Sequence, residues 1–188
     1  MSAGKCLWRK RLLTLTAAVL LCTPSGQAVQ TMVYEKPAVY GKSVDETLGT
    51  AVLMLKGEEG MLCVWCADPG LETRQGSRYW ILTPQMVGGL YERNADQIAS
   101  VLQRSWPAVS LEQLQESCGI NNLTLQEAIS ATQLAVWSLT QGYMQYMGEE
   151  RVDTAVTWLL LGDRQESGKE MIVCWPLEAG LQPRVGLQ

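Results

Sequence analysis

Apolar and polar positions follow two different periods along the chain. Between residues 31 and 83, short runs rich in valine, leucine, tyrosine and tryptophan alternate with segments of glycine, aspartate and proline, a pattern typical of β-strands joined by turns. Strands are predicted over four ranges: 31–36, 51–56, 60–67 and 78–83. The first part of the domain is therefore expected to form a β-sheet.

The middle of the chain changes to the period of a helix. Capping boxes, in which a side chain at the helix start and one three residues later bind each other's backbone N–H groups, are predicted at three places: 94–97, 110–113 and 124–127. Gly119 and Gly142 are suited to end the second and third helices. A further helix is predicted over 153–162.

The helix that begins at Thr124 carries a regular apolar stripe. Its members are Leu125, Ala128, Ile129, Thr132, Ala135, Val136 and Leu139. Gln133 lies among apolar neighbours, with Ile129 and Trp137 one turn away on either side. Since a buried amide without a partner costs about 1–3 kcal/mol, this glutamine needs a structural or chemical explanation.

The end of the chain returns to strand character over 169–177 and 181–187. Strands followed by helices and then by strands predict an α+β fold. We expect an antiparallel, barrel-like β-sheet with a helical middle segment, and last strands that rejoin the first sheet. Since no linker divides the sequence, a single domain is predicted over 29–188.

The first 28 residues have the pattern of a secretory signal peptide. Four basic residues precede an apolar run over 12–22, and small residues occupy the positions that signal peptidase reads, Gly26 and Ala28. Cleavage after Ala28 would leave a secreted or surface-displayed domain. The apolar run is shorter than the ~20 residues of a membrane-spanning helix, so no membrane span is expected in the mature chain.

Charge and composition narrow the function classes. The 188-residue chain has 15 basic and 19 acidic residues; without the four basic leader residues it has 11 basic and 19 acidic, a net charge of −8. This acidic balance argues against nucleic-acid binding. The absence of histidine removes the usual general base of Ser-His and Cys-His catalysis and the commonest metal ligand. No cofactor or metal is expected.

Four cysteines remain in the mature chain: Cys63, Cys66, Cys118 and Cys174. In an exported protein they are expected to form disulfides, with connectivity left open. Cys63 and Cys66 are three residues apart, which on a regular strand points them to opposite faces. A C-x-x-C redox pair normally opens a helix, whereas Asp-Pro-Gly follows here. A four-thiolate zinc site is disfavoured because the compartment is oxidising.

The sequence Thr-Gln-Leu-Ala-Val-Trp over 132–137 resembles the signature helix of thioester domains in Gram-positive bacterial surface adhesins. The sequence Trp-Cys-Ala-Asp-Pro-Gly over 65–70 is similar to the family's upstream cysteine element, and 180–185 is similar to its closing glutamine-containing segment. The resemblance implies an internal thioester between Cys66 and Gln133. Leu62-Cys63 also fits the cysteine element, so Cys63 is an alternative thiol.

The resemblance also implies a mode of action. The thioester would bind covalently to a nucleophile, typically a lysine amine, on a surface protein of a host or a neighbouring cell. Each molecule would react once, so the protein would be an adhesin and not an enzyme. The side chains expected to form the pocket and exclude water are Ile129, Thr132, Val136 and Trp137. The family's stalk domains and wall-sorting signal are not recognised, which leaves the mode of anchoring open.

Two other functions remain open at the level of sequence. One is a disulfide-stabilised extracellular module that binds its partner non-covalently, with Gln133 and the cysteines unreacted. The other is a thiol oxidoreductase that uses Cys63 and Cys66. The target, the catalytic base and the oxyanion donor are not identified by the sequence.

Overall fold

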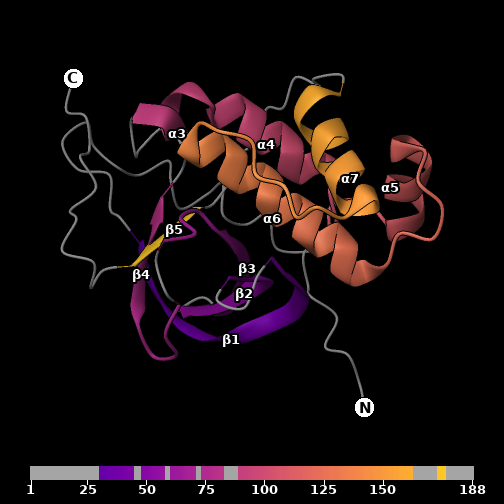
Figure 1. Cartoon of the computed structure of the whole chain (residues 1–188). Helices are drawn as coiled ribbons and strands as arrows, with labels where there is room; N and C mark the ends of the chain where they lie inside the picture. The colour runs from indigo at the N-terminus through magenta and orange to yellow at the C-terminus, as the bar shows by residue number, and fades with distance from the viewer. Residues whose placement is uncertain are drawn as a thin grey trace, which may run out of the picture. The chain divides into compact units, whose positions relative to one another are not determined.

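The described part of the protein has a curved β-sheet packed against a layer of helices (Figure 1). The computed structural model describes residues 30–44, 48–57, 60–70, 73–82, 89–162 and 173–176. The expected leader over 1–28 and the expected strand over 181–187 lie outside these ranges. From Thr31 onward the chain forms one compact unit. The fold is α+β, as the sequence predicts.

Five strands form the sheet in the order β1-β2-β3-β5-β4. They are β1 (Gln30–Ser43), β2 (Gly49–Gly57), β3 (Gly60–Cys66), β4 (Arg78–Leu82) and β5 (Val173–Pro176). The ladders of β1 with β2, β2 with β3 and β4 with β5 are antiparallel, whereas β3 and β5 are parallel. Since β5 lies between β3 and β4, the described part of the strand predicted over 169–177 rejoins the first sheet, as expected.

The sheet curls into a barrel-like form (Figure 1). Tyr34 in β1 donates its backbone N–H to Ser77, and Gly76 donates to the Tyr34 carbonyl, both at 2.9 Å, which joins β1 to the segment that leads into β4. The predicted strand over 31–36 was too short, because β1 continues past Pro37 to Ser43. Register shifts in β1, including one between Pro37 and Val39, accommodate the proline and increase the bend.

Alternating residues of the strands pack on two sides. One small core inside the sheet consists of Tyr34, Leu53, Leu55, Val64 and Tyr79. The residues next to these in β2 and β3, Val52 and Trp65, belong instead to the large core shared with the helices. This alternation follows from the two-residue period of a strand. It gives β3 one face toward the helical layer, where its end approaches α6.

Five helices are described. They are α3 (Gly89–Arg93), α4 (Ala95–Arg104), α5 (Leu111–Cys118), α6 (Leu125–Gln141) and α7 (Glu150–Leu161). The capping boxes at Ser110 and Thr124 are confirmed, and Gly119 and Gly142 end their helices with φ of 68° and 79°. The helix predicted over 153–162 begins three residues earlier than expected, at Glu150. The short helix α3 was not predicted.

The capping box expected at Asn94 is wrong. Asn94 precedes α4, but its side chain makes no cap hydrogen bond. Its Nδ2 instead donates to the Leu139 carbonyl of α6 at 2.7 Å. The Asn94 side chain therefore binds a carbonyl near the C-terminal end of α6 in place of the backbone of its own helix, and this contact joins α4 to α6.

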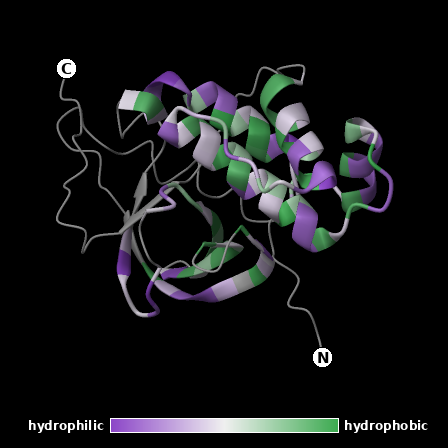
Figure 2. Cartoon of the chain, viewed as in Figure 1, coloured by the Kyte–Doolittle hydropathy of each residue, from purple (hydrophilic) through white to green (hydrophobic). Residues whose placement is uncertain are grey.

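Helix α6 lies at the centre of the helical layer, where α4 and α7 pack against it (Figure 1). Every residue from Glu127 to Ser138 is buried, so the predicted one-sided stripe describes only part of its packing. Figure 2 shows hydrophobic residues on α4, α6 and α7 where these helices lie together. Because the helix is enclosed on several sides, its side chains are held firmly against β2 and β3.

Three polar contacts fix α6 against β1 and α7. Glu127, 1% exposed, pairs with Arg151 of α7 at 2.5 Å and with Lys42 of β1 at 3.5 Å. Ser130 of α6 accepts a hydrogen bond from the Lys42 backbone N–H at 2.8 Å. Gly41 permits this close approach, since a Cβ there would lie 2.2 Å from Thr50 Oγ1 and 2.8 Å from Ser130 Oγ.

None of the helices in the described ranges combines the length and the apolar character needed to cross a membrane.

Candidate functional site

Gln133 lies in the middle of α6 and is fully buried, at 0% exposure. Its carboxamide binds the backbone of Cys66, which is 67 residues away in the sequence: Nε2 donates to the Cys66 carbonyl at 2.7 Å, and the Cys66 N–H donates to Oε1 at 3.2 Å. Both polar atoms of the side chain therefore have partners. The burial of this amide is explained by a specific contact with the end of β3.

Cys66 is the last residue of β3 and a free thiol. Its Sγ donates to the Asp68 carbonyl at 3.2 Å. Burial raises the pKa of the Cys66 thiol to about 11, and the hydrogen bond to the backbone of Asp68 opposes this rise. At neutral pH the group is therefore held as a thiol, and an attack by its thiolate requires that the proton be removed first.

Cys63, the alternative thiol, is disulfide-bonded in the structure. Since Cys66 and Cys118 are both free, neither is its partner, and the C-x-x-C cysteines do not form a disulfide with each other. Cys63 lies in register with Met54 of β2. Of the two cysteines on β3, Cys66 is the one whose backbone binds Gln133 and whose thiol is free.

Two hydrogen bonds hold the backbone directly after Cys66. The Ala67 carbonyl accepts from Tyr91 Oη of α3 at 3.0 Å and from Thr140 Oγ1 of α6 at 2.8 Å. Asp68 then forms a local turn, in which its Oδ1 accepts from Gly70 N at 2.8 Å. Sequence reasoning missed Tyr91 and Thr140. Thr140 lies two turns beyond Gln133 on the same side of the helix, and this spacing could have identified it as a residue near the site. Nothing in the sequence marks Tyr91.

The four side chains expected to form the pocket, Ile129, Thr132, Val136 and Trp137, are all buried. The Thr132 hydroxyl donates to the Ala128 carbonyl at 2.8 Å, within its own helix, and Gln133 is not its partner. Ile129 faces β1, because a Cβ at Gly41 would lie 2.9 Å from its Cγ2. Trp137 interacts with the Cys66 thiol and lowers its pKa, against the larger effect of burial.

This arrangement has the parts of an acyl-transfer site. The Gln133 carboxamide on α6 is hydrogen-bonded to the backbone of the residue at the end of β3 that carries a free thiol, and fixing two such groups on rigid elements raises their effective concentration. The Cys66 N–H donates to the carboxamide oxygen, where negative charge develops when a nucleophile attacks the carbon. This backbone N–H is placed as an oxyanion donor would be, and the sequence did not reveal it.

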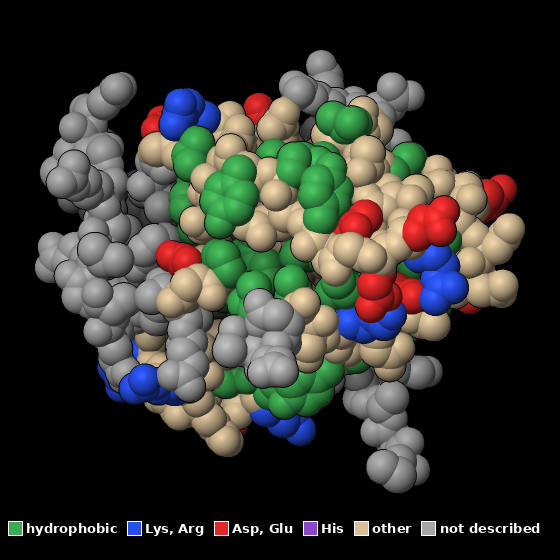
Figure 3. Space-filling model, in the orientation of Figure 1, with side chains coloured by type: hydrophobic (Ala, Val, Ile, Leu, Met, Phe, Trp, Pro, Cys, Tyr) green, Lys and Arg blue, Asp and Glu red, His purple; other side chains and the backbone are tan. Residues whose placement is uncertain are grey.

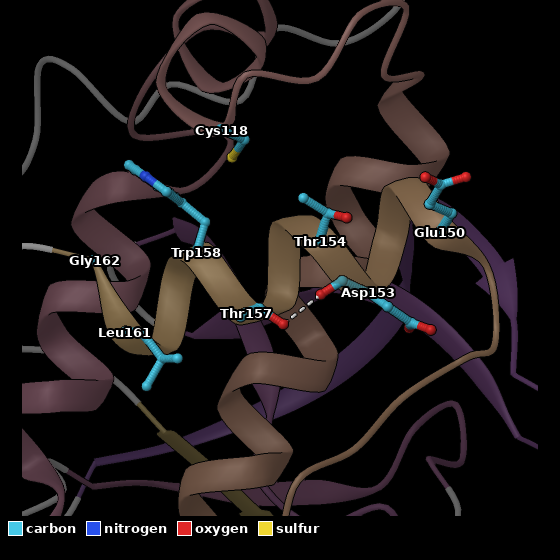
Figure 4. A pocket seen from close by; sticks show the side chains of 8 residues that line it. All are labelled: Cys118, Glu150, Asp153, Thr154, Thr157, Trp158, Leu161 and Gly162. Carbon is cyan, nitrogen blue, oxygen red and sulfur yellow. Dashed lines mark hydrogen bonds between the residues drawn. The ribbon is translucent and has the colours of Figure 1, made fainter.

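An open groove of about 630 Å³ lies elsewhere, along α7 (Figure 4). It is lined by Cys118, Glu150, Asp153, Thr154, Thr157, Trp158, Leu161 and Gly162. In it the Thr157 hydroxyl donates to the Asp153 backbone carbonyl, an interaction within the helix. The groove contains none of the residues predicted for the site. Within the described ranges, no group of three or more acidic or cysteine side chains is arranged to bind a metal ion.

Hydrophobic side chains gather over the helical layer on the face seen in Figure 3. The segment that follows α6 exposes Tyr143, Met144 and Tyr146, with exposures of 60%, 43% and 49%. Its backbone is joined to the end of α6, where Gln145 N donates to Ser138 Oγ at 2.8 Å. This exposed apolar segment begins three residues after Thr140, which binds the backbone beside Cys66.

Comparison with known proteins gives two matches. The family model described as "Thioester domain" matches residues 63–165, which is more than half of the 188-residue chain and includes both Cys66 and Gln133. The N-terminal thioester domain of a surface protein from Clostridium perfringens has a similar structure, with a TM-score of 0.56 and 14% identity. That likeness covers 79% of this chain and 93% of the other. No curated protein sequence matches.

Proposed function

The chain belongs to the thioester domain family, and on this premise we propose that Cys66 and Gln133 form an internal thioester that binds covalently to amines on other surface proteins. The observation that carries the proposal is the pair of hydrogen bonds between the Gln133 carboxamide and the backbone of Cys66, at 2.7 and 3.2 Å. These bonds hold the electrophilic carbon next to the residue that carries the free thiol.

Formation of the bond is an acyl transfer from nitrogen to sulfur. The sulfur of Cys66 attacks the side-chain carbonyl carbon of Gln133, and the C–N bond breaks. The amide nitrogen leaves as ammonia, which takes up the thiol proton. The Cys66 N–H stabilises the oxygen during the attack, as an oxyanion donor does.

The surroundings support a bond that survives until a target arrives. Gln133 is fully buried, and Val136 and Trp137 next to it are each 2% exposed. These side chains keep water from the acyl carbon. A thioester has no N–H group to satisfy, so an apolar site suits it better than it suits a primary amide.

The bound target would be a surface protein of a host or a neighbouring cell. A lysine amine attacks the acyl carbon of Gln133, the C–S bond breaks, and an amide forms while Cys66 returns to a thiol. Each molecule reacts once, so this is covalent adhesion and not turnover. The expected signal peptide and the surface protein that contains the similar domain support a secreted or surface-displayed location.

Incorporation of methylamine tests the proposal. The purified mature protein is incubated with methylamine, and peptides are analysed by mass spectrometry. We expect N-methylation of the Gln133 amide and one new free thiol at Cys66. Both changes should be abolished by Cys66→Ala and by Gln133→Ala, and neither by Cys118→Ala, which removes the free thiol in the α7 groove.

A protein with no methylamine at Gln133 would contradict the proposal and would favour a non-covalent binding module. If incorporation is abolished by Cys63→Ala but persists in Cys66→Ala, the proposed function would stand, and the cysteine of the thioester would be Cys63. Dithiol turnover that tolerates Gln133→Ala would favour a thiol oxidoreductase.

A further inference from the structure

Trp137 has a buried hydrogen-bond donor that finds no partner of ordinary geometry in the described part of the chain. The side chain is 2% exposed, and its Nε1 is fully enclosed. An indole has a single N–H group, which usually finds an acceptor when it is buried. Leaving it unpaired costs free energy, so this donor needs an explanation.

The Cys66 thiol is the candidate acceptor for this donor. Trp137 lies one turn after Gln133 on α6, so the two side chains share a face of the helix. Gln133 is bound to the backbone of Cys66, and the Cys66 side chain packs against the core cluster that includes Trp137. Burial dominates the raised pKa of the Cys66 thiol, and Trp137 makes a smaller, lowering contribution, as an N–H group near the sulfur would.

A protonated thiol explains why the indole remains poorly partnered. The Cys66 thiol donates its own proton to the Asp68 carbonyl, and a thiol sulfur is a weak acceptor. A thiolate carries a full negative charge and is a far better acceptor. The indole N–H would therefore be fully used only when the sulfur is charged.

We propose that the Trp137 Nε1–H is the donor that stabilises the Cys66 sulfur while it is negatively charged, and that it thereby sets the rate at which amines open the thioester. This inference rests on the proposed function of the same site. It makes Trp137 a catalytic residue for both formation and opening of the bond, in addition to being a wall of the pocket.

The two donors then have separate tasks in the opening step. An amine adds to the acyl carbon of Gln133, and the Cys66 N–H stabilises the resulting oxyanion. When the C–S bond breaks, its electron pair stays on sulfur, next to the indole. The extra proton of the amine then passes to sulfur, directly or through water, and regenerates the thiol. Without the indole, the negative charge would develop on a buried sulfur with no donor from this side chain, and burial disfavours such a charge.

Replacement of the indole N–H tests this proposal. Trp137→Phe removes the donor and keeps an aromatic ring, while β-(3-benzothienyl)alanine at position 137 keeps the shape and replaces the N–H with sulfur. Trp158→Phe is the matched control, since Trp158 of α7 stacks on Arg104 of α4. The rate of methylamine incorporation is measured by mass spectrometry on protein that carries the thioester.

We expect both replacements at Trp137 to slow incorporation about tenfold to a hundredfold, the effect of one hydrogen bond to a charged group, and the control to leave it unchanged. A benzothienyl variant that reacts within twofold of the natural protein would overturn the proposal. That variant decides the outcome if Trp137→Phe fails to fold, because its side chain fills the same space.

A second readout separates this inference from the proposed function. In a Gln133→Ala, Cys118→Ser background no thioester can form, and the alkylation rate of Cys66 by iodoacetamide is followed against pH in the Cys66 peptide. The midpoint should move to higher pH in the benzothienyl variant, and an unchanged midpoint would overturn the role of Trp137. Absence of methylamine incorporation in the natural protein would defeat the proposed function, while this midpoint would still decide the role of Trp137.

Discussion

At the scale of single residues, the contact between Gln133 and Cys66 explains the burial of the glutamine and underlies the proposed thioester. The hydrogen bonds that satisfy the buried carboxamide, at 2.7 and 3.2 Å, also hold it against the backbone of the residue that carries the free thiol. A glutamine that only needed satisfied polar atoms would have no use for a free thiol at the same place. Cys66 is a free thiol while Cys63, three residues earlier, is disulfide-bonded, which is the state that the proposed thioester requires of Cys66.

The raised pKa of Cys66 predicts how formation of the thioester depends on pH. Burial raises the pKa to about 11, so the reactive thiolate is a small fraction at neutral pH and grows about tenfold with each pH unit below that value. We expect freshly refolded protein to form the thioester faster at pH 9 than at pH 7. The loss of ammonia is followed by intact mass against time. A rate that does not change between these pH values would show that thiol ionisation does not limit the reaction.

The same shift has a consequence for stability before the bond forms. The folded state holds the thiol proton more tightly than the unfolded state, whose thiol has the ordinary pKa of 9.0. This contribution to stability is present below pH 9 and is lost as the pH rises toward about 11. Alkaline pH therefore favours the reaction and at the same time weakens the fold of the unreacted protein.

At the scale of elements, the site depends on how closely α6 approaches the sheet. Gly41 of β1 faces Ser130 of α6, and the Ser130 hydroxyl lies 2.8 Å from both Lys42 N and Thr50 Oγ1. Three positions further along the helix, Gln133 reaches the end of β3. The contact at Gly41 and the contact between Gln133 and Cys66 are therefore two points of one interface between α6 and the strands.

Substitution of Gly41 tests this interface. Gly41→Ala would place a Cβ 2.2 Å from Thr50 Oγ1 and 2.8 Å from Ser130 Oγ, so β1 or α6 must move. We expect the free energy of unfolding to fall by about 1–3 kcal/mol, measured by denaturant titration, and thioester formation to slow. Gly49→Ala is the matched control, because a Cβ there meets nothing within 4 Å. Equal stability of the two variants would show that the approach is not tight.

At the scale of the whole molecule, the proposed bond would be a covalent cross-link between the sheet and the helical layer. Cys66 and Gln133 are 67 residues apart in the sequence. Closing a loop of that length removes conformational entropy from the unfolded chain, and the chain-entropy estimate for a cross-link is about 4 kcal/mol. The fold is thus expected to be more stable before it reacts with an amine than afterwards.

Thermal unfolding compares these two states directly. Protein with the intact bond should unfold at a higher temperature than the same preparation after treatment with methylamine, because opening the bond releases the cross-link. Gln133→Ala, which cannot form the bond, provides a control in which methylamine changes nothing. Identical melting temperatures before and after amine treatment would mean that the bond does not constrain the unfolded chain.

The sequence predicts local features of this fold better than its long-range contacts. The capping boxes at Ser110 and Thr124 were predictable because all their partners lie within three residues. The end of β1 was missed because a bulge accommodates Pro37, and the cap at Asn94 failed because its side chain binds Leu139, 45 residues away. The end of a strand and the partner of a polar side chain depend on tertiary contacts that the hydrophobic period of the sequence does not reveal.

The residues of the candidate site likewise include some that the sequence predicted and others that it did not. The pairing of Cys66 with Gln133 followed from a resemblance of two short motifs, and the structure brings these two residues into contact. The residues that hold the chain after Cys66, Tyr91 and Thr140, come from 24 and 73 residues away from Ala67 and carry no motif. The proposed oxyanion donor is a backbone N–H, which every residue except proline possesses, so no sequence pattern could single it out.

Intact mass of the freshly purified, folded mature protein tests the central claim most directly. If Cys66 and Gln133 have reacted, the mass is lower than that of the sequence by one ammonia, after allowance for the disulfide of Cys63. The deficit should disappear in Cys66→Ala and in Gln133→Ala and persist in Cys118→Ala. A natural protein whose mass shows no missing ammonia, under conditions where it is folded, would contradict the account.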